Sequence, residues 1–452
     1  MADAFRIEHD TMGEMRVPAD ALYGAQTARA VENFPISRLR FPRAFIWALA
    51  LIKSVAARVN GEMGHLPADK AGAIERASEE VLAGALDAQF VVDIFQTGSG
   101  TSTNMNANEV IGRLAGAHPN DEVNRGQSSN DVIPSALHIA AAESVHRDLF
   151  PAMDVLDASL ARKAHEFGNV MKIGRTHLQD AVPMRLGQEF SGYARQVAAS
   201  RERIECALGG IYELALGGTA VGTGLNAPPG FAAAVIREIA RRTELPFIET
   251  RNHFEAQAAK DAVVFLSGAM RTYAIALTKI ANDIRWLGSG PRCGLGELRL
   301  PAVQPGSSIM PGKVNPVIAE SVLMVCAQVV GYDATIAWSG AAGNFELNVM
   351  MPVMAYDLLK SIALLAAASR NFAGRLVDSL AADSERAGAF VEQSLAMGTA
   401  LVPEIGYEKA AALVKEAYQA GKTVREVARE KSGIPEEQLN EALDPTRQSG
   451  GG

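Results

Sequence analysis

Apolar residues recur every three to four positions through most of the chain, which is the spacing of one face of an α-helix. The clearest run consists of Val263, Leu266, Met270, Tyr273, Leu277, Ile280, Ile284 and Leu287. Similar patterns predict long helices over residues 134–167, 183–214, 255–287, 317–339 and 353–376. Few strand-like runs separate these segments, so we predict a mainly α protein with a long helical bundle at its centre.

Shorter helical patterns flank this bundle, at residues 43–63 and 69–92 before it and at residues 406–420, 423–431 and 435–443 after it. We therefore predict three domains: an N-terminal mixed, mostly helical domain (1–127), a central long-helix bundle (128–385) and a small C-terminal helical domain (386–452). Several central segments are apolar on more than one face, which favours burial against other subunits. A thick single-chain bundle is the alternative.

The composition is that of a folded globular protein, since 48% of the 452 residues are hydrophobic and 21% are charged. A net charge of −8 argues against nucleic acid or an anionic membrane as the main partner. The three cysteines, Cys206, Cys293 and Cys326, are too few and too widely spaced for a disulfide framework or a thiolate metal cluster, which indicates a reducing compartment.

The first residues show no basic segment followed by an apolar stretch, so no secretory signal is expected. The longest apolar runs, residues 44–52 and 362–368, are shorter than the roughly 18 residues that cross a bilayer. We expect a soluble, cytoplasmic protein.

Two segments rich in Gly, Ser, Thr and Asn precede predicted helices. In residues 96–106, backbone N–H groups beside the Ser99 and Thr101 hydroxyls would suit an anion, although a loop with helix-capping residues explains the composition equally well. Residues 127–134 open the next long helix, where the simplest interpretation is an N-cap. The pair Gly98 and Gly100 lacks the third glycine and the preceding strand of a dinucleotide-binding turn.

Two further segments carry groups suited to acid–base chemistry. His177 lies in a polar segment that we predict to be a loop before a helix starting at Pro183; most single histidines are structural, but this one is well placed to exchange protons. Residues 306–316, Gly-Ser-Ser-Ile-Met-Pro-Gly-Lys-Val-Asn-Pro, place two hydroxyls, an ammonium and an amide on a glycine-hinged loop, with Glu320 just beyond.

The 306–316 segment is not a nucleotide-binding P-loop. Five residues separate Gly306 from Gly312 where that motif has four, and Val314 replaces its Ser or Thr. The sequence contains no H-E-x-x-H, paired-cysteine or G-x-S-x-G motif. We expect chemistry that needs no metal, cofactor or covalent intermediate.

The 306–316 segment resembles the signature loop of the fumarase/aspartase superfamily, and the similarity extends from residues 17–27 to residues 443–445. Ser128, Ser129 and Asn130, with Gly-Asn-Phe-Glu-Leu-Asn at residues 343–348, resemble class II fumarate hydratases most closely. Val317–Ile318 instead resembles aspartases. The chain is thus similar to hydratases in most of the segments expected at the active site.

This resemblance implies a homotetramer whose bundles form a 20-helix core, with each active site shared by three subunits. The implied reaction is the reversible, stereospecific hydration of fumarate to (S)-malate in the citric acid cycle, without a metal. The implied substrate contacts are Ser99, Gly100, Thr101, Ser128, Ser129, Asn130, Thr176, Ser308, Lys313 and Asn315.

The resemblance also implies the catalytic roles. Ser307 matches the base that removes the C3 proton of malate, and His177, paired with Glu320, matches the acid or water-activating group; the opposite role for His177 stays open. Lys313 and Asn315 would stabilise the charge that builds up on the substrate carboxylate. A serine is a weak base unless its alkoxide is stabilised, so Ser307 requires loop amides and Lys313 nearby.

A second dicarboxylate site is implied at His118, Pro119, Asn120 and Asp121. The chain departs from the family pattern there, because Ala115 stands where relatives often carry a basic residue. Two other functions remain open: aspartate ammonia-lyase activity on the same scaffold, and a catalytically silent homologue of the lens-crystallin kind. The intact catalytic residues argue against the second.

Overall fold

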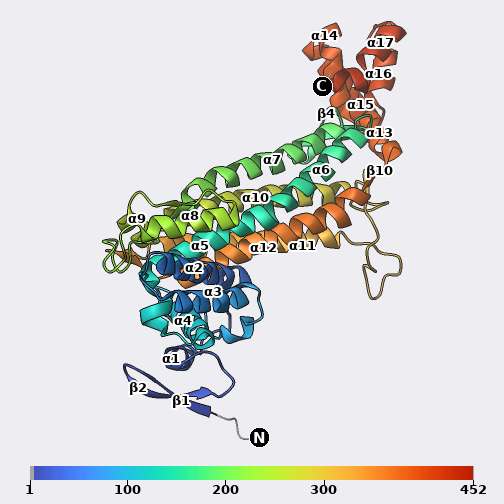
Figure 1. The fold of residues 1–452 in the computed structure, drawn as a ribbon. Coiled ribbons are helices and arrows are strands. Elements are labelled where there is room, and N and C mark those ends of the chain that lie inside the picture. The colour runs from blue at the N-terminus through green and yellow to red at the C-terminus, as the bar shows by residue number, and fades with distance from the viewer. Residues whose placement is uncertain (1–4, 451–452) are drawn as a thin grey trace. The chain divides into compact units, whose positions relative to one another are not determined.

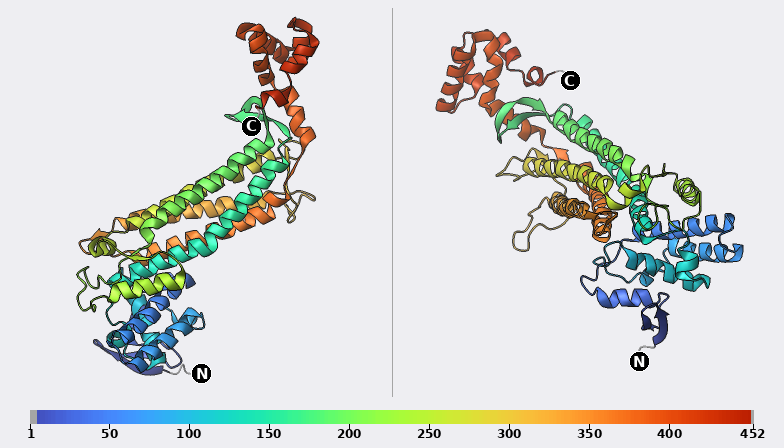
Figure 2. Two further views of the ribbon diagram at one scale, coloured as in Figure 1. Left: turned by 45° about the horizontal axis from the view of Figure 1, so that its top comes forward. Right: turned by 90° about the vertical axis from the view of Figure 1, so that its left-hand side faces the viewer.

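The computed structural model describes residues 5–450 (Figures 1 and 2). By their contacts, these residues divide into two compact units. Of the described residues, unit 1 comprises 5–151, Ser200–Ala274 and Cys326–Ala366, and unit 2 comprises Ala152–Ala199, Ile275–Val325 and 367–450. The boundaries of the units cut across long helices. The predicted three-domain division at residues 127 and 385 stays a prediction.

Long helices dominate the chain, as the periodicity predicts. Five of them contribute residues to both units: α6 (Phe150–Glu166), α7 (Leu186–Ile211), α10 (Asp261–Leu287), α11 (Val317–Gly340) and α12 (Met351–Arg375). Of the eight apolar residues in the predicted stripe on α10, seven have no exposed surface and Leu287 is 4% exposed. Burying each such side chain stabilises the fold by roughly 1.5–3 kcal/mol, so this stripe confirms the predicted core-facing side of α10.

Three of the predicted bundle segments are divided differently in the structure. Residues 134–167 form α5 (Ser129–Ser144) and α6 with a π-helical turn, Val145–Leu149, between them. Residues 255–287 form α9 (His253–Ala258) and α10, because the backbone is extended at Ala259; the Lys260 ammonium donates to three carbonyls at this break. The helix predicted from Pro183 begins at Leu186, since the residues before it pair in a strand.

Unit 1 is built around α2, which packs against α3, α5 and α8. Its remaining elements are β1 (Phe5–Asp10), β2 (Gly13–Pro18), α1 (Ala25–Asn33), α2 (Arg43–Glu62), α3 (Ala68–Leu82), α4 (Thr101–Ala115), β5 (Glu213–Leu214), α8 (Phe231–Thr243), β6 (Ile248–Glu249), β8 (Gly343–Asn344) and β9 (Leu347–Asn348). The β1–β2 hairpin was not predicted. The helix predicted over 69–92 ends at Leu82, and a short 3-10 turn, Asp87–Gln89, follows.

Unit 2 contains a hairpin, a short sheet and a cluster of small C-terminal helices, which Figure 2 shows gathered together in red and orange. Its elements are β3 (Met171–Thr176), β4 (Gln179–Arg185), β7 (Leu298–Arg299), β10 (Ala381–Ala382), α13 (Ser384–Gln393), α14 (Val402–Ile405), α15 (Tyr407–Ala420), α16 (Val424–Lys431), α17 (Glu436–Ala442) and α18 (Pro445–Gln448). The predicted C-terminal helices are confirmed, with a Thr423–Glu426 capping box starting α16. No sheet among residues 5–450 has more than two strands.

Four helical segments in the described part of the chain are long and apolar enough to cross a membrane by length and composition: α2, α10, α11 and Met351–Ser379. This corrects the expectation that no apolar stretch reaches that length, because small polar residues interrupt the apolar runs without making the helices hydrophilic. Inside the chain, 78% of the apolar window of α2 is buried but only 28% of that of α11. The apolar residues of α2 therefore belong to the core, whereas many of those of α11 are exposed on the surface of the single chain.

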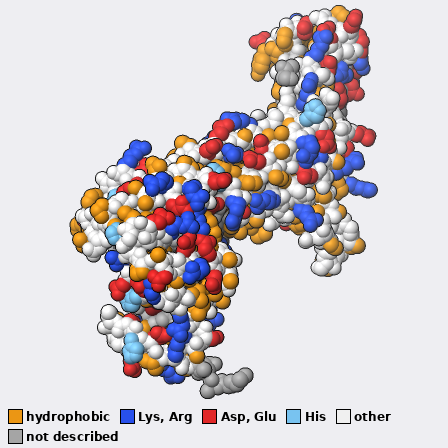
Figure 3. Space-filling view, in the orientation of Figure 1, with side chains coloured by type: hydrophobic (Ala, Val, Ile, Leu, Met, Phe, Trp, Pro, Cys, Tyr) orange, Lys and Arg blue, Asp and Glu red, His pale blue; other side chains and the backbone are white. Residues whose placement is uncertain are grey.

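On the face of the molecule in Figure 3, acidic and basic side chains are interspersed. Within residues 5–450, no three His, Cys, Asp or Glu side chains gather in a way that could hold a metal ion.

Candidate active site

The residues predicted to bind substrate occur in both units. Ser99, Gly100 and Thr101, together with Ser128, Ser129 and Asn130, belong to unit 1. Thr176, His177, Ser307, Ser308, Lys313, Asn315 and Glu320 belong to unit 2.

Two glycines shape the loop before α4. A Cβ on Gly98 would lie 1.8 Å from the carbonyl oxygen of Val349, and one on Gly100, whose φ is 75°, would lie 2.9 Å from the Ile133 side chain. This close packing keeps Ser99 buried, and its Oγ lies 2.7 Å from Thr101 Oγ1 at the first residue of α4. Gly100 offers no side-chain cap, but the Gln96 side-chain oxygen accepts from the Thr103 N–H at 3.0 Å. The amides of Thr101 and Ser102 have no acceptor among residues 5–450, so they and the two hydroxyls suit an anion.

The second polar segment begins α5 beside the first. Ser128 is the N-cap and forms a capping box with Asp131, as the sequence indicates. Asn104 on α4 donates to Ser129 Oγ at 3.0 Å, and Asn130 donates to the carbonyl of Ala220 at 2.8 Å. The structure therefore brings two of the predicted substrate-binding segments together within unit 1.

Asp131 fastens this end of α5 to a distant loop. Its buried carboxylate accepts from the backbone N–H groups of Ser128, Gly217 and Thr219, at 2.9, 3.0 and 3.0 Å. Burial raises the pKa of Asp131 despite these donors. Sequence reasoning assigned no role to residues 217–220, because nothing local in that loop connects it to α5.

Sequence reasoning also missed a buried lysine behind the same segment. Lys53 has no exposed surface, and its ammonium donates to the side-chain oxygens of Asn124 and Gln127, both at 2.9 Å. Burial lowers the pKa of Lys53 to about 7. A lysine within the apolar stretch of residues 44–52 and 55–57 was the available signal in the sequence.

His177 lies at the tip of the antiparallel β3–β4 hairpin rather than in a loop before a helix, which corrects the prediction. His177 and Leu178 form the two-residue turn, with φ values of 57° and 60°, and Thr176 pairs with Gln179 on either side of it. Such a turn requires two residues with positive φ, and Asn-Gly is its usual sequence. At the base of the turn, Arg175 forms two hydrogen bonds, at 2.8 and 3.0 Å, with the fully buried Glu297.

The 306–316 loop is closed at its base. The Gly306 N–H donates to the Lys313 carbonyl at 2.9 Å, and the Asn315 side-chain amide donates to the Gly306 carbonyl at 2.6 Å. A Cβ on Gly306 would lie 2.3 Å from the Lys313 carbonyl oxygen, so this closure requires glycine. Ser308 and Lys313 are exposed, and Glu320 lies in the first turn of α11.

Ser307 has the backbone N–H donors that a serine base requires, whereas no hydrogen bond joins it to the Lys313 side chain among residues 5–450. The Ser307 Oγ accepts hydrogen bonds from the backbone N–H groups of Ile309 at 3.2 Å and Met310 at 3.0 Å. Two N–H donors on one oxygen stabilise negative charge there. Among the contacts of residues 5–450, no hydrogen bond or ion pair joins His177 to Glu320, so one chain alone does not form the predicted pair.

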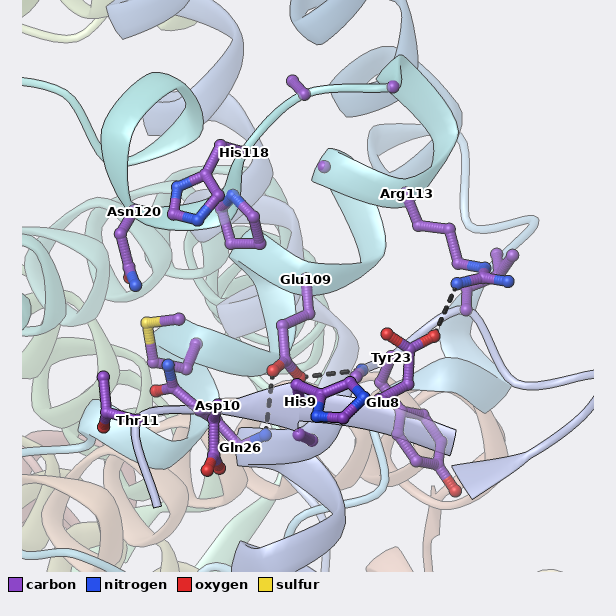
Figure 4. A pocket seen from close by; sticks show the side chains of 18 residues that line it. Glu8, His9, Asp10, Thr11, Tyr23, Gln26, Glu109, Arg113, His118 and Asn120 are labelled. Atoms are coloured by element: carbon purple, nitrogen blue, oxygen red, sulfur yellow. Dashed lines mark hydrogen bonds and ion pairs between the residues drawn. The ribbon is translucent and has the colours of Figure 1, made fainter. Parts of the chain in front are cut away.

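The predicted second dicarboxylate site borders a cavity of about 720 Å³ in unit 1 (Figure 4). His118, Pro119 and Asn120 line the cavity, whereas Asp121 does not; its N–H instead donates to His118 Nδ1 at 3.1 Å. Figure 4 shows His118 and Asn120 on one wall, with His9 and Asp10 along another.

The charges around this cavity do not favour a dianion. Arg113 is the one Lys or Arg in its wall, and it is paired with Glu8 at 2.8 Å. Three carboxylates, those of Glu8, Asp10 and Glu109, also line the cavity. Among residues 5–450, no uncommitted Lys or Arg therefore lines this wall.

Two family models match this chain. The family model described as Lyase matches residues 13–331, and the model described as Fumarase C C-terminus matches residues 398–447. The helical fold and these matches define the chain as a lyase of the fumarase/aspartase superfamily.

Three similar proteins narrow this class. The class II fumarate hydratase of Corynebacterium glutamicum is 54% identical over 443 residues, which cover 97% of this chain and 94% of that protein. The crystal structure of recombinant class II fumarase from Schistosoma mansoni is 41% identical, with a TM-score of 0.97 and 99% of both chains covered. A structure described as fumarate lyase:delta crystallin from Brucella melitensis bound to cobalt is 45% identical, with a TM-score of 0.95, and covers 99% of this chain and 100% of that one. The chain belongs to the class II fumarate hydratase family.

Proposed function

We propose that this protein catalyses the reversible, stereospecific hydration of fumarate to (S)-malate as a step of the citric acid cycle in the cytoplasm, by acid–base catalysis that needs no metal. The observation that carries the proposal is the 54% identity to a class II fumarate hydratase over 97% of the chain. The three free cysteines support a reducing compartment.

In the dehydration direction, we propose that Ser307 removes the C3 proton of malate. The carboxylate beside C3 then gains charge, and Lys313, Asn315 and the helix-start amides of α4 and α5 stabilise it. The Ile309 and Met310 N–H groups support this role, because they stabilise the Ser307 alkoxide. The Asn315 amide is occupied by Gly306 in the present conformation, so contact with substrate requires the loop to rearrange.

We propose that His177 and Glu320 form their pair between subunits and handle the departing hydroxyl as water. The support is that His177 is exposed at a hairpin tip and makes no bond to Glu320 of its own chain. Glu320 would then select the imidazole tautomer and stabilise the imidazolium.

A homotetramer with a shared 20-helix core, and with active sites assembled from three subunits, is part of the proposal. Its support is the uncovered apolar surface of α11, where Met324 is 68% exposed, Val330 41% and Trp338 75%. Surfaces of this kind are covered by partners in most soluble proteins. Light scattering on the purified protein should give four times the 47.9 kDa chain mass; a monomer would refute the shared site.

The test of the reaction is to add purified, chelator-treated protein to (S)-malate and, separately, to L-aspartate, and to follow the ultraviolet absorbance of fumarate. Fumarate from malate alone supports the proposal. Fumarate from aspartate alone would favour aspartate ammonia-lyase, the alternative for which Val317–Ile318 speaks. No product from either would favour a catalytically silent homologue, and activity restored only by added metal would refute the metal-free mechanism.

Dicarboxylate binding at His118, Pro119, Asn120 and Asp121 also remains a proposal. Its support is the cavity beside three of these residues. Replacing Asn120 with alanine should leave turnover unchanged and remove any second binding event in calorimetry with malate.

A further inference from the structure

The environment of Lys53 is unusual for a residue with no catalytic assignment. It lies on α2 with no exposed surface, and its neighbours along the helix are almost all buried and apolar. Within residues 5–450, the ammonium has no carboxylate at ion-pair distance, although the charge of the buried Asp131 attracts it from farther away. Its hydrogen-bond acceptors are the amide oxygens of Asn124 and Gln127. A buried ammonium without a carboxylate in contact lowers stability, so a methionine of similar length would suit the core better.

The acceptors of Lys53 lead directly to the substrate-binding segment. The Asn124 amide donates to the backbone carbonyl of Gln127 at 3.1 Å, which closes the turn immediately before Ser128. The oxygen of Asn124 also accepts from Asn104 at 3.2 Å, and Asn104 in turn donates to Ser129 Oγ at 3.0 Å. Hydrogen bonds therefore connect the ammonium, through Asn124 and Asn104, to Ser129 Oγ. Through Asn124 they also reach the Gln127 carbonyl, which directly precedes Ser128 in the backbone.

The hydrogen bonds around Asn124 hold its side chain in one orientation. Asn124 Oδ1 accepts three donors, from Lys53, Asn104 and Asn108, while the buried oxygens of Asn104 and Asn108 have no partner among residues 5–450. Three donors on one oxygen leave little freedom for the turn to shift, because a displaced amide would leave further buried groups unpaired.

We infer that Lys53 is a positioning residue for carboxylate binding: its ammonium holds the turn of residues 124–127 and thereby sets Ser128, Ser129 and Asn130 in the geometry that receives a substrate carboxylate. This inference rests on the proposed function. Lys53 does not touch substrate and acts only through the amides.

The test is the fumarate-hydration kinetics of Lys53→Met in the assembled protein. Misplaced binding groups weaken substrate binding, so the KM for fumarate should rise about tenfold, with kcat changed less than about threefold. The matched control is Lys163→Met, a lysine 4% exposed that bonds to Glu166 and to the Leu380 carbonyl in unit 2. It should lower thermal stability without altering KM, which separates positioning from a general loss of folding.

An unchanged KM in Lys53→Met would overturn the inference while the wild-type activity still supports the proposed function. If Lys53→Met fails to assemble, Gln127→Met takes its place, because it removes one acceptor of the ammonium from a less buried site. The same rise in KM is expected, and a wild-type KM would overturn the inference. A wild-type protein that does not hydrate fumarate would instead reject the proposed function itself, and the inference with it.

Discussion

Replacing Ser307 with alanine should separate the chemistry of the 306–316 loop from its folding. The substitution removes the oxygen that accepts the N–H groups of Ile309 and Met310. Ile309 is 85% exposed and Met310 48%, so water can replace the lost acceptor. We expect the free energy of unfolding to change by less than about 0.5 kcal/mol, as at other exposed sites.

The effect on turnover should be large. One preorganised N–H donor stabilises an oxyanion by about 2.7–4 kcal/mol, so two donors on the Ser307 alkoxide supply about 5–8 kcal/mol. Because each 1.36 kcal/mol corresponds to about tenfold in rate, this range converts to 10⁴–10⁶-fold. The Ile309 hydrogen bond is long, at 3.2 Å, so we expect the lower end, a fall in kcat of about 10⁴.

The assay is the absorbance of fumarate formed from (S)-malate, with oligomeric mass and thermal unfolding measured on the same samples. Ser191→Ala is the matched control, since Ser191 is exposed on α7 and its hydroxyl bonds only locally, to the Gln188 carbonyl. The control should retain full activity. Turnover of Ser307→Ala within tenfold of wild type would show that Ser307 is not the base.

Three further predictions test other parts of unit 1. Glu109→Gln should destabilise the protein by about 2 kcal/mol, because the carboxylate accepts three backbone N–H groups and one hydroxyl at the start of α1 and an amide cannot accept all four. Urea unfolding measures the loss, with the exposed Glu80→Gln as the control. Equal unfolding midpoints for the two variants would contradict the capping role of Glu109. Burial lowers the pKa of His138 to about 4, so between pH 6.5 and 4 the unfolded chain binds a proton that the folded chain does not. As the pH is lowered through this range, the free energy of unfolding should decrease by up to about 3 kcal/mol. His138→Asn should make the unfolding midpoint less dependent on pH over that range, and an unaltered dependence would exclude the effect. Gly98→Ala should cost about 3 kcal/mol and raise the KM for fumarate, since its Cβ would lie 1.8 Å from a carbonyl oxygen; a wild-type KM would show that the loop absorbs the methyl group.

The sequence by itself determined the features that depend on local spacing. The buried stripe of α10 follows from its apolar period, and α16 begins at a capping box that spans three residues. The family is also recognisable from short segments, since residues 306–316 and the polar start of α5 carry its pattern without any knowledge of the fold. In each case the information lies within a few helical turns, so tertiary contacts do not have to be known.

Only the tertiary structure decided where distant groups meet. The hairpin that presents His177 lacks a clear alternation of apolar and polar residues in its strands, and its turn is not Asn-Gly. The positive φ values of His177 and Leu178 therefore depend on strand pairing and on the Arg175–Glu297 ion pair. Position 98 must be glycine because the Val349 carbonyl, about 250 residues away in sequence, lies against it. The role inferred for Lys53 likewise depends on its hydrogen bond to an amide about 70 residues away. Backbone and side-chain groups that are far apart along the chain satisfy one another only after packing, which is why spacing alone does not reveal them.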